Sequence, residues 1–190
     1  MTIRPDKSAL RRQARAGRLG LAAPDRAAAQ RRVAELLEQR RRAQGWRRIA
    51  GYLAVRSELD LAAWLEALPA DVELALPAIA ADGQLRFRAW RAGDALEPGA
   101  GAIPQPAAGA AEVAAGELDV IILPLVGFDA ARYRLGSGAG HYDRALAFRA
   151  GRPPPPLLVG AAFACQRLPP LPHDPWDVPM DAVVTEAGWS

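Results

Sequence analysis

Helical and extended periodicities alternate along this chain of 190 residues. Apolar positions three and four residues apart, with Val33, Leu36 and Leu37 on one face, predict a helix over residues 25–44. The same spacing predicts a short helix over residues 59–68. Apolar runs with strand-like length predict buried strands at residues 48–54, 72–79, 119–128, 157–163 and 181–185.

Turn and cap residues complete this pattern. Asp6 is suited to cap a helix that starts at Lys7, and a break is expected over residues 19–24. Alternation over residues 85–90 predicts an exposed or edge strand. A Gly-, Ala- and Pro-rich stretch at residues 91–118 is expected to be a long loop. A further helix is expected within residues 138–150.

Strands that alternate with helices predict an α/β fold. We expect a single three-layer domain over residues 1–190, with a mostly parallel central sheet flanked by helices and an N-terminal helical segment. Ligands of such sheets bind at the carboxyl ends of the strands. Glu58 and the segments 136–143 and 163–166 all follow such ends, so these are the candidate positions for a site.

The segment after the central apolar run carries the strongest chemical signal. Gly136, Gly138 and Gly140 alternate and are followed at once by His141, Tyr142, Asp143 and Arg144. Glycines let backbone N–H groups approach an anion closely. The spacing matches neither a P-loop nor a dinucleotide fingerprint, so a turn that binds no ligand remains an alternative.

Composition excludes several classes of protein. No apolar run approaches the ~18 residues that span a bilayer, and the N-terminus lacks the apolar core of a secretory signal, so a cytoplasmic protein is expected. A lone Cys165, with only His141 and His173, excludes a disulfide framework and Cys- or His-rich metal sites. A hard metal held by carboxylates remains possible.

Charge is unevenly distributed. Residues 1–48 hold 14 Lys and Arg against 4 Asp and Glu, although the whole chain carries only +3. Such a basic arm suits nucleic acid or another polyanion, but no aromatic residue before Trp46 offers base stacking. A solvated, Arg-rich helical face is the simpler interpretation.

The motifs together resemble the 5-formyltetrahydrofolate cyclo-ligase (methenyltetrahydrofolate synthetase) family over nearly the whole chain. The glycine loop with its Tyr-Asp pair is the most specific of them. In chain order they are Lys7-x-x-Leu-Arg11, Tyr52-Leu-x-x-x-x-Glu58, Ile103-Pro-Gln-Pro106, Leu123-Pro-x-x-x-Phe-Asp129, Arg134-Leu-Gly-x-Gly-x-Gly-x-Tyr-Asp143, Val159-Gly-x-Ala-Phe-x-x-Gln166 and Asp177-x-Pro-Met-Asp181.

The resemblance implies a ligase that cyclises 5-formyltetrahydrofolate to 5,10-methenyltetrahydrofolate with ATP and Mg²⁺, through a phosphorylated formyl intermediate. It implies small-molecule substrates, no nucleic acid and no membrane, and nothing in it demands more than a monomer. Phosphoryl transfer relies on positioning and charge neutralisation more than on a protein nucleophile. That requirement agrees with the residue types in the glycine loop.

The resemblance also implies residue roles. Catalytic roles fall to Lys7, Asp143 and Arg144, and metal binding to Asp143 and Asp181. Residues implied to bind ATP are Lys7, Arg11, Arg134, Gly136, Ser137, Gly138, Ala139, Gly140, His141 and Tyr142. Residues implied to bind the folate are Leu53, Glu58, Ser137, Gly138, Gly140, His141 and Tyr142.

Alternatives stay open at several of these positions. Lys7, the only lysine of the chain, could be a solvated surface residue, and Glu58 could cap the following helix. Asp174 and Asp177 lie close to Asp181 in the sequence, which leaves the second metal ligand open. At the level of the whole protein, the alternatives are a noncatalytic folate- or nucleotide-binding protein and a nucleic-acid-binding protein.

Overall fold

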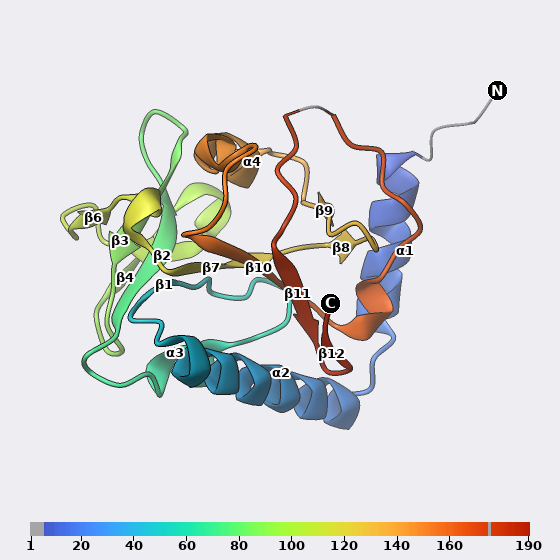
Figure 1. The fold of residues 1–190 in the computed structure, drawn as a ribbon, viewed down its shortest axis with the longest axis horizontal. Coiled ribbons are helices and arrows are strands. Elements are labelled where there is room, and N and C mark those ends of the chain that lie inside the picture. Colours follow the sequence, from blue (N-terminus) through green and yellow to red (C-terminus); the bar gives the residue numbers. More distant parts are fainter. Residues whose placement is uncertain (1–5, 175) are drawn as a thin grey trace.

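The computed structural model describes residues 6–174 and 176–190. One sheet contains eight strands in the order β12-β11-β10-β7-β1-β2-β3-β6 (Figure 1). The five strands from β11 to β2 are mutually parallel, and β12, β3 and β6 add antiparallel edges. The strands of this sheet are β1 (Arg48–Ala50), β2 (Glu73–Ile79), β3 (Leu85–Ala89), β6 (Glu112–Val113), β7 (Val120–Pro124), β10 (Leu157–Ala161), β11 (Ala182–Thr185) and β12 (Gly188–Trp189).

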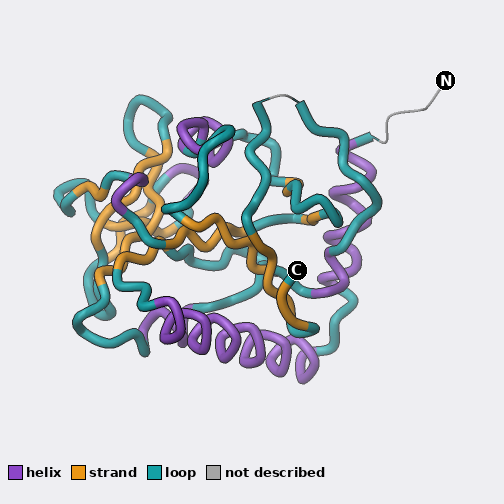
Figure 2. The backbone as a smooth tube through the Cα atoms, in the orientation of Figure 1, coloured by secondary structure: helices purple, strands orange, loops and turns teal. Residues whose placement is uncertain are grey.

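Four α-helices and short 3-10 turns surround the sheet, which confirms the predicted α/β class with its flanking helices (Figure 2). Two separate hairpins, β4-β5 and β8-β9, complete the strands. The remaining elements are α1 (Lys7–Leu19), α2 (Ala23–Gln44), α3 (Ala62–Glu66), α4 (His141–Ala145), β4 (Leu96–Pro98), β5 (Pro104–Pro106), β8 (Gly127–Phe128), β9 (Arg134–Leu135), η1 (Ala100–Ala102), η2 (Ala115–Glu117), η3 (Ala147–Arg149) and η4 (Ala164–Gln166).

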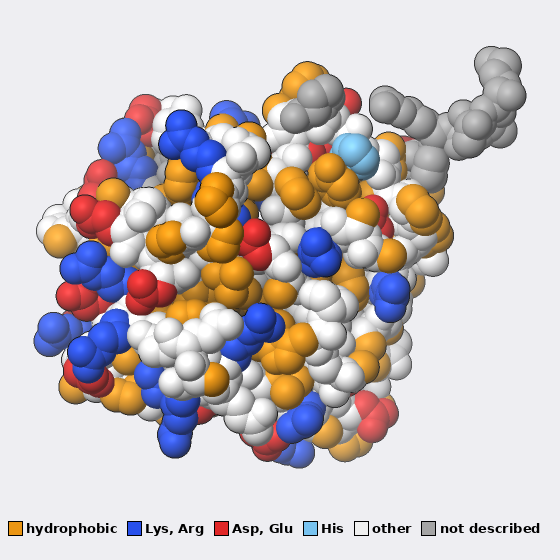
Figure 3. All heavy atoms as spheres, viewed as in Figure 1, with side chains coloured by type: hydrophobic (Ala, Val, Ile, Leu, Met, Phe, Trp, Pro, Cys, Tyr) orange, Lys and Arg blue, Asp and Glu red, His pale blue; other side chains and the backbone are white. Residues whose placement is uncertain are grey.

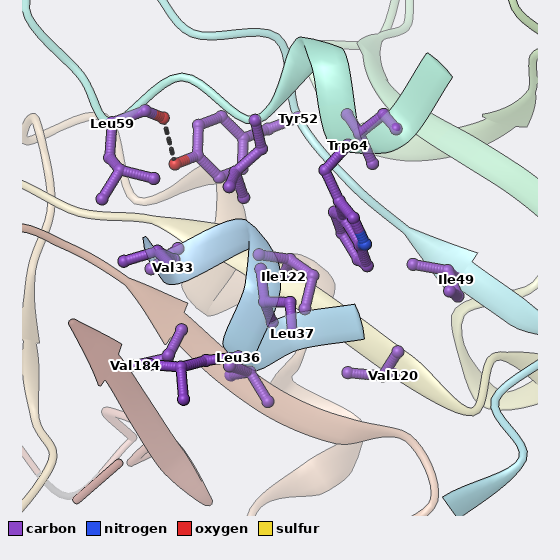
Figure 4. Packing of buried hydrophobic residues seen from close by; sticks show 14 of the residues in the cluster. Val33, Leu36, Leu37, Ile49, Tyr52, Leu59, Trp64, Val120, Ile122 and Val184 are labelled. Atoms are coloured by element: carbon purple, nitrogen blue, oxygen red, sulfur yellow. Dashed lines mark hydrogen bonds between the residues drawn. The ribbon is translucent and has the colours of Figure 1, made fainter. Parts of the chain in front are cut away.

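Alternate residues of each strand face opposite sides of the sheet. On one side Ile49, Val120, Ile122 and Val184 pack against α2 and α3, and Figure 4 shows them converging around Leu37. On the other side their neighbours, such as Ile121 and Val183, pack with Leu146 and Met180. Burying each such side chain stabilises the fold by about 1.5–3 kcal/mol. The sheet therefore forms the middle layer of three.

Helix α1 stands at one end of the layers rather than over a sheet face (Figure 1). Asp6 caps it, since its carboxylate accepts the backbone N–H groups of Ser8 at 2.9 Å and Ala9 at 3.2 Å. Its buried Leu10 and Ala14 pack against the β8-β9 hairpin and residues 168–171. The predicted cap is confirmed, and α1 is fixed beside the segment that carries the glycine loop.

Three predicted strands are shorter than their apolar runs, and the one predicted over residues 157–163 ends at Ala161. The strand predicted over residues 48–54 ends at Ala50. A Cβ at Gly51 would lie 2.7 Å from Leu65, so the chain passes closely under α3 there. The strand predicted over residues 119–128 is interrupted after Pro124. There the Gln166 amide donates to the carbonyls of Leu125 at 2.8 Å and Val126 at 2.9 Å.

Two predicted helices are also shorter. The helix expected within residues 138–150 begins only at His141, because Gly138 and Gly140 have φ of 119° and 66°. It ends at Ala145 and is followed by a 3-10 turn over residues 147–149. The helix predicted over residues 59–68 spans Ala62–Glu66. The backbone angles of these glycines thus determine where the helix after the loop begins.

The stretch 91–118 is not the plain loop that its composition predicts. It contains β4, β5 and β6, and β6 pairs with β3 through Phe87 and Val113. The final strand β12 was not predicted either, and it pairs with β11. Strands of two or three residues carry no periodicity of their own, so their long-range partners define them.

The surface is mixed in charge. On the face drawn in Figure 3, Lys and Arg side chains are interspersed with Asp, Glu and apolar ones. Across the described residues, no helix combines the length and apolarity needed to cross a membrane.

Candidate functional site

Strand order identifies where a ligand can bind. The chain moves from β1 to β2 on one side and later from β7 to β10 and β11 on the other, so the direction reverses between β1 and β7. In doubly wound sheets, a crevice opens at the carboxyl ends of the two strands that flank such a reversal. The loop after β1 carries Tyr52 and Glu58, and the segment after β7 carries the glycine loop.

The glycine loop is exposed from Gly136 to Ala139. Its φ of 119° at Gly138 is a conformation that other residues rarely adopt. A Cβ there would also stand 3.7 Å from the Arg11 guanidinium. Glycine is therefore required at this position by the backbone angle, since a Cβ would meet Arg11 at an ordinary contact distance.

Helix α1 reaches this loop although 125 residues separate them in the sequence. The Arg11 side chain donates through Nε to the Gly136 carbonyl at 2.9 Å. One turn earlier, the Lys7 ammonium lies 3.8 Å from Asp177 and 3.9 Å from Asp174. The structure thus brings the predicted cations Lys7 and Arg11 to one side of the loop, and Lys7 is not an isolated surface residue.

Arg134 connects the loop to the C-terminal segment. Its guanidinium is only 5% exposed, pairs with the Asp143 carboxylate, and donates to the Val178 carbonyl at 2.9 Å. The Asp143 side chain remains 38% exposed. Because Val178 follows Asp177, a continuous chain of contacts runs from Asp143 through Arg134 to the segment that carries Asp177.

Arg144 turns back onto the loop. It donates to the Ala139 carbonyl at 3.0 Å and to Nδ1 of His141 at 3.1 Å, and its side chain is exposed. These contacts hold the backbone of the loop. A direct catalytic role for Arg144 stays a prediction.

Glu58 and two tyrosines form the opposite wall. Glu58 is half-buried and accepts the Val55 N–H at 3.0 Å. Burial raises the pKa of its carboxyl, while the Val55 hydrogen bond and the charges of Arg18 and Arg56 lower it. The pKa values of Tyr52 and Tyr142 are raised, first by burial and then by the charge of Glu58. The charge of Glu58 thus acts on both tyrosines.

The apolar part of this wall is also ordered. The Tyr52 hydroxyl donates to the Leu59 carbonyl at 2.7 Å, as the dashed line in Figure 4 shows. Leu53 is half-buried against the α2 side of the core. The cap role considered for Glu58 is wrong, because α3 has Leu61 at its N-cap without any side-chain hydrogen bond.

Asp181 stands in different surroundings from Asp143. Both of its carboxylate oxygens accept from Arg149, at 2.9 and 2.8 Å, and one also accepts the Leu158 N–H at 2.7 Å. Leu158 lies near the start of β10, so Asp181 sits where the parallel strands begin, away from their carboxyl ends. As arranged, Asp181 completes a structural ion pair, and the predicted metal role would require Arg149 to release it.

Three residues near the site were assigned no definite role from the sequence, although Gln166 lies in the candidate segment 163–166 and Asp177 was left open as a metal ligand. Gln166 fixes the break after β7, Asp177 contacts Lys7, and Arg18 is buried near Glu58. Only Gln166 and Asp177 fall in motifs. The described residues contain no cluster of three or more His, Cys, Asp or Glu side chains that could hold a metal ion. A metal would therefore depend on one or two carboxylates plus ligands from a substrate.

Comparison with known proteins agrees with these motifs. The model of the 5-formyltetrahydrofolate cyclo-ligase family matches residues 3–186. An Escherichia coli K12 protein named 5-formyltetrahydrofolate cyclo-ligase is 48% identical over 68 residues, which are 36% of this chain and 36% of that protein. A Haemophilus influenzae protein of the same name is 45% identical over 64 residues, 34% of this chain and 33% of that protein. These matches span about a third of the curated relatives.

Solved structures extend the likeness over the whole fold. The Aquifex aeolicus 5,10-methenyltetrahydrofolate synthetase has a TM-score of 0.82 and 31% identity, covering 96% of this chain and 91% of that one. A Mycoplasma pneumoniae 5,10-methenyltetrahydrofolate synthetase has a TM-score of 0.76 and covers 96% of this chain and 99% of that one. Its 24% identity supports the fold alone.

Proposed function

Because this chain belongs to the 5-formyltetrahydrofolate cyclo-ligase family, we propose that it uses ATP to cyclise 5-formyltetrahydrofolate to 5,10-methenyltetrahydrofolate. The observation that carries the proposal is the meeting of α1 with the glycine loop, through Arg11 and Gly136, beside the Glu58 wall. One wall offers cations and backbone N–H groups for phosphate, and the other offers a carboxylate between aromatic rings for a heterocycle.

The reaction needs an activated formyl oxygen. That oxygen attacks the γ-phosphorus of ATP, the bond to the bridging oxygen breaks, and ADP leaves. Nitrogen 10 then adds to the former formyl carbon and loses its proton, and phosphate departs with the original formyl oxygen. Each step requires orientation and charge neutralisation but no protein nucleophile. The exposed loop and its surrounding cations suit those two requirements.

We assign ATP binding to the α1 side of the site. Lys7 and Arg11 would neutralise phosphate oxygens, and Arg134 would hold Asp143 and the loop in place. The loop from Gly136 to Tyr142 would supply backbone donors. Lys7 lies between two carboxylates at nearly 4 Å, a loose arrangement that a phosphate group could replace.

We assign the pterin part of the folate to the Glu58 side. The amino group and ring N–H of a pterin form a paired donor edge, which an ionised carboxylate accepts. One oxygen of Glu58 is already fixed by Val55. Leu53 and Tyr142 would line the ring faces, and the loop between the two walls would contact the formyl group.

Magnesium fits the donor set near Arg134. Carboxylate oxygens suit Mg²⁺, which usually takes one or two of them and fills its other positions with phosphate oxygens and water. We propose the partly exposed Asp143 as one ligand and Asp177 rather than Asp181 as the second, because Arg149 holds both oxygens of Asp181, whereas Arg134 holds only Oδ1 of Asp143. Bound there, the ion would neutralise charge on the transferred phosphoryl group.

The test is a single assay with purified protein, MgATP and 5-formyltetrahydrofolate. The expected result is the methenyl chromophore together with ADP in equal amounts, and neither product when ATP is omitted. If correctly folded protein at high concentration binds folate but forms no chromophore, the protein is a noncatalytic folate-binding protein and the proposed activity is wrong.

The proposal further includes a cytoplasmic monomer that acts on small molecules and does not bind nucleic acid. The basic first 48 residues make this part testable, because affinity for DNA or RNA would fall steeply with salt. Tight, strongly salt-dependent binding of nucleic acid would contradict it.

A further inference from the structure

Arg18 is the least expected charged residue near the site. It lies at the C-terminal end of α1 and is only 4% exposed. Its Nε and Nη1 atoms are buried and have no hydrogen-bond partner within the described residues. A buried donor without a partner costs about 1–3 kcal/mol, and more when it is charged, so a compensating charge is expected nearby.

The backbone around Arg18 is tied directly to the loop that carries Glu58. The Arg26 guanidinium donates through Nη2 to the Arg18 carbonyl and through Nη1 to the Ser57 carbonyl at 3.1 Å. Arg26 also lies over the Phe163 ring, 5.0 Å from its centroid. The end of α1 and the segment just before Glu58 are therefore fixed relative to each other.

The charged and titratable groups around Glu58 come from four elements. Arg18 from α1 and Arg56 from the segment after β1 act on its carboxyl, and Glu58 acts on Tyr52 and on Tyr142 from α4. Arg26 from α2 donates to the carbonyl of the preceding Ser57. Both tyrosines stay neutral, since burial raises their pKa values. Arg56 is exposed, so water screens its charge, and Arg26 is occupied by two carbonyls. Arg18 is the buried cation whose donors remain available.

We propose that Arg18 is a positioning residue whose buried guanidinium keeps Glu58 ionised in the folate site. The inference rests on the function proposed above. A bound pterin would remove water from Glu58 and make its charge harder to keep, so the counter-charge matters most in the complex. Without Arg18, Glu58 would take up a proton more readily and could no longer accept both pterin donors.

Turnover measured over a range of pH tests this role. Arg18→Met is expected to raise the KM for 5-formyltetrahydrofolate about tenfold at the acidic end, equivalent to one pKa unit of Glu58, and to recover at the alkaline end. The kcat and the KM for ATP should change much less. Arg18→Lys, which keeps the charge, should restore most of the affinity, and exposed Arg12→Met on the same helix is the control.

A double variant separates positioning from direct contact. In a Glu58→Gln background, Arg18→Met should leave the folate KM unchanged at every pH. An equal rise of KM at all pH values, or a further rise in the Glu58→Gln background, would show that Arg18 contacts the substrate or only supports the fold, and either result overturns the proposal.

A stability cycle decides the question without any substrate. If the two charges compensate each other, the unfolding temperature of the double variant Arg18→Met with Glu58→Gln should fall by less than the summed falls of the two single variants. Additive losses would overturn the proposal even if Arg18→Met alone folds poorly. If the unaltered protein shows no turnover, that result contradicts the proposed function instead, so the two failures can be told apart.

Discussion

Where the strands of the central sheet begin, charged side chains meet their partners at short distances. Asp119 accepts the backbone N–H groups of Arg47 at 2.7 Å and Arg48 at 2.9 Å. Asp181 engages Arg149 and the Leu158 N–H, all within 2.9 Å. Each of these carboxylates joins segments that are distant in the sequence, so this edge of the sheet is tied together by completed interactions.

Where the same strands end, Arg134 and Asp143 form an ion pair, but other charged residues of the described chain are incompletely paired. Lys7 stands 3.8–3.9 Å from its two carboxylates, Glu58 holds one backbone donor, and Arg18 has two unpartnered nitrogens. Satisfied polar groups stabilise a fold, whereas unsatisfied ones cost stability unless something else binds them. The difference separates a structural edge from an edge arranged for ligands, and residue type alone does not distinguish the two.

The sharpest test compares an aspartate from each edge, beginning with Asp143. We expect Asp143→Asn to reduce kcat/KM about a thousandfold, equivalent to about 4 kcal/mol of transition-state stabilisation. The free energy of unfolding should fall as well, because Arg134, whose side chain is only 5% exposed, would lose its counter-charge, so turnover is compared per folded molecule. Steady-state kinetics and thermal unfolding check both statements. Asp25→Asn, an exposed acid in the first turn of α2, is the control.

Asp181→Asn is expected to lower stability without that loss of turnover. It would leave Arg149, only 3% exposed, without its counter-charge and lower the free energy of unfolding by about 3 kcal/mol. Turnover per folded molecule should stay close to normal, as denaturant titration beside kinetics can show. Adding Arg149→Met should recover part of the loss. Loss of turnover at unchanged stability would instead restore the metal role predicted from the sequence.

Sequence reasoning succeeds where local pattern decides. The continuous apolar run that includes Ile121 and Ile122 identifies a buried strand, and Asp6 identifies a helix start. It fails where distant segments meet. No local pattern tells that Asp181 faces Arg149 or that Asp177 faces Lys7, since both contacts depend on how the C-terminal segment crosses the fold. The burial of Arg18 cannot be predicted from the sequence for the same reason.

Lys7 tests the loosely paired edge directly. Lys7→Met should raise the KM for ATP about thirtyfold, close to 2 kcal/mol, because a phosphate would lose its cation next to the carboxylates of Asp174 and Asp177. Stability should hardly change, since the side chain is 40% exposed. Lys7→Arg keeps the charge and should raise the KM for ATP by less than Lys7→Met. A normal KM for ATP in the Met variant would remove Lys7 from the phosphate site.

The smallest expected effect comes from Glu38, which extends the comparison to the helical layer. Glu38 accepts from Arg41 at 2.8 Å, from Arg42 at 2.7 Å and from the Trp64 indole at 3.2 Å. These contacts, led by Arg41, lower its pKa to about 2. It is thus as fully paired as the structural edge of the sheet, and we expect Glu38→Gln to cost about 1 kcal/mol near neutral pH.

The pH dependence of that loss identifies its cause. A lowered pKa in the folded state contributes stability above the unfolded value of about 4.5, and this contribution disappears as the pH falls toward 2. The gap between the unaltered protein and Glu38→Gln in urea unfolding should therefore narrow below pH 4.5. Glu35→Gln, which removes an exposed pair with Arg32 on the same helix, should change stability by less than about 0.5 kcal/mol. A gap that stays constant with pH would mean that packing or hydrogen bonding, rather than the charge of Glu38, ties α2 to α3.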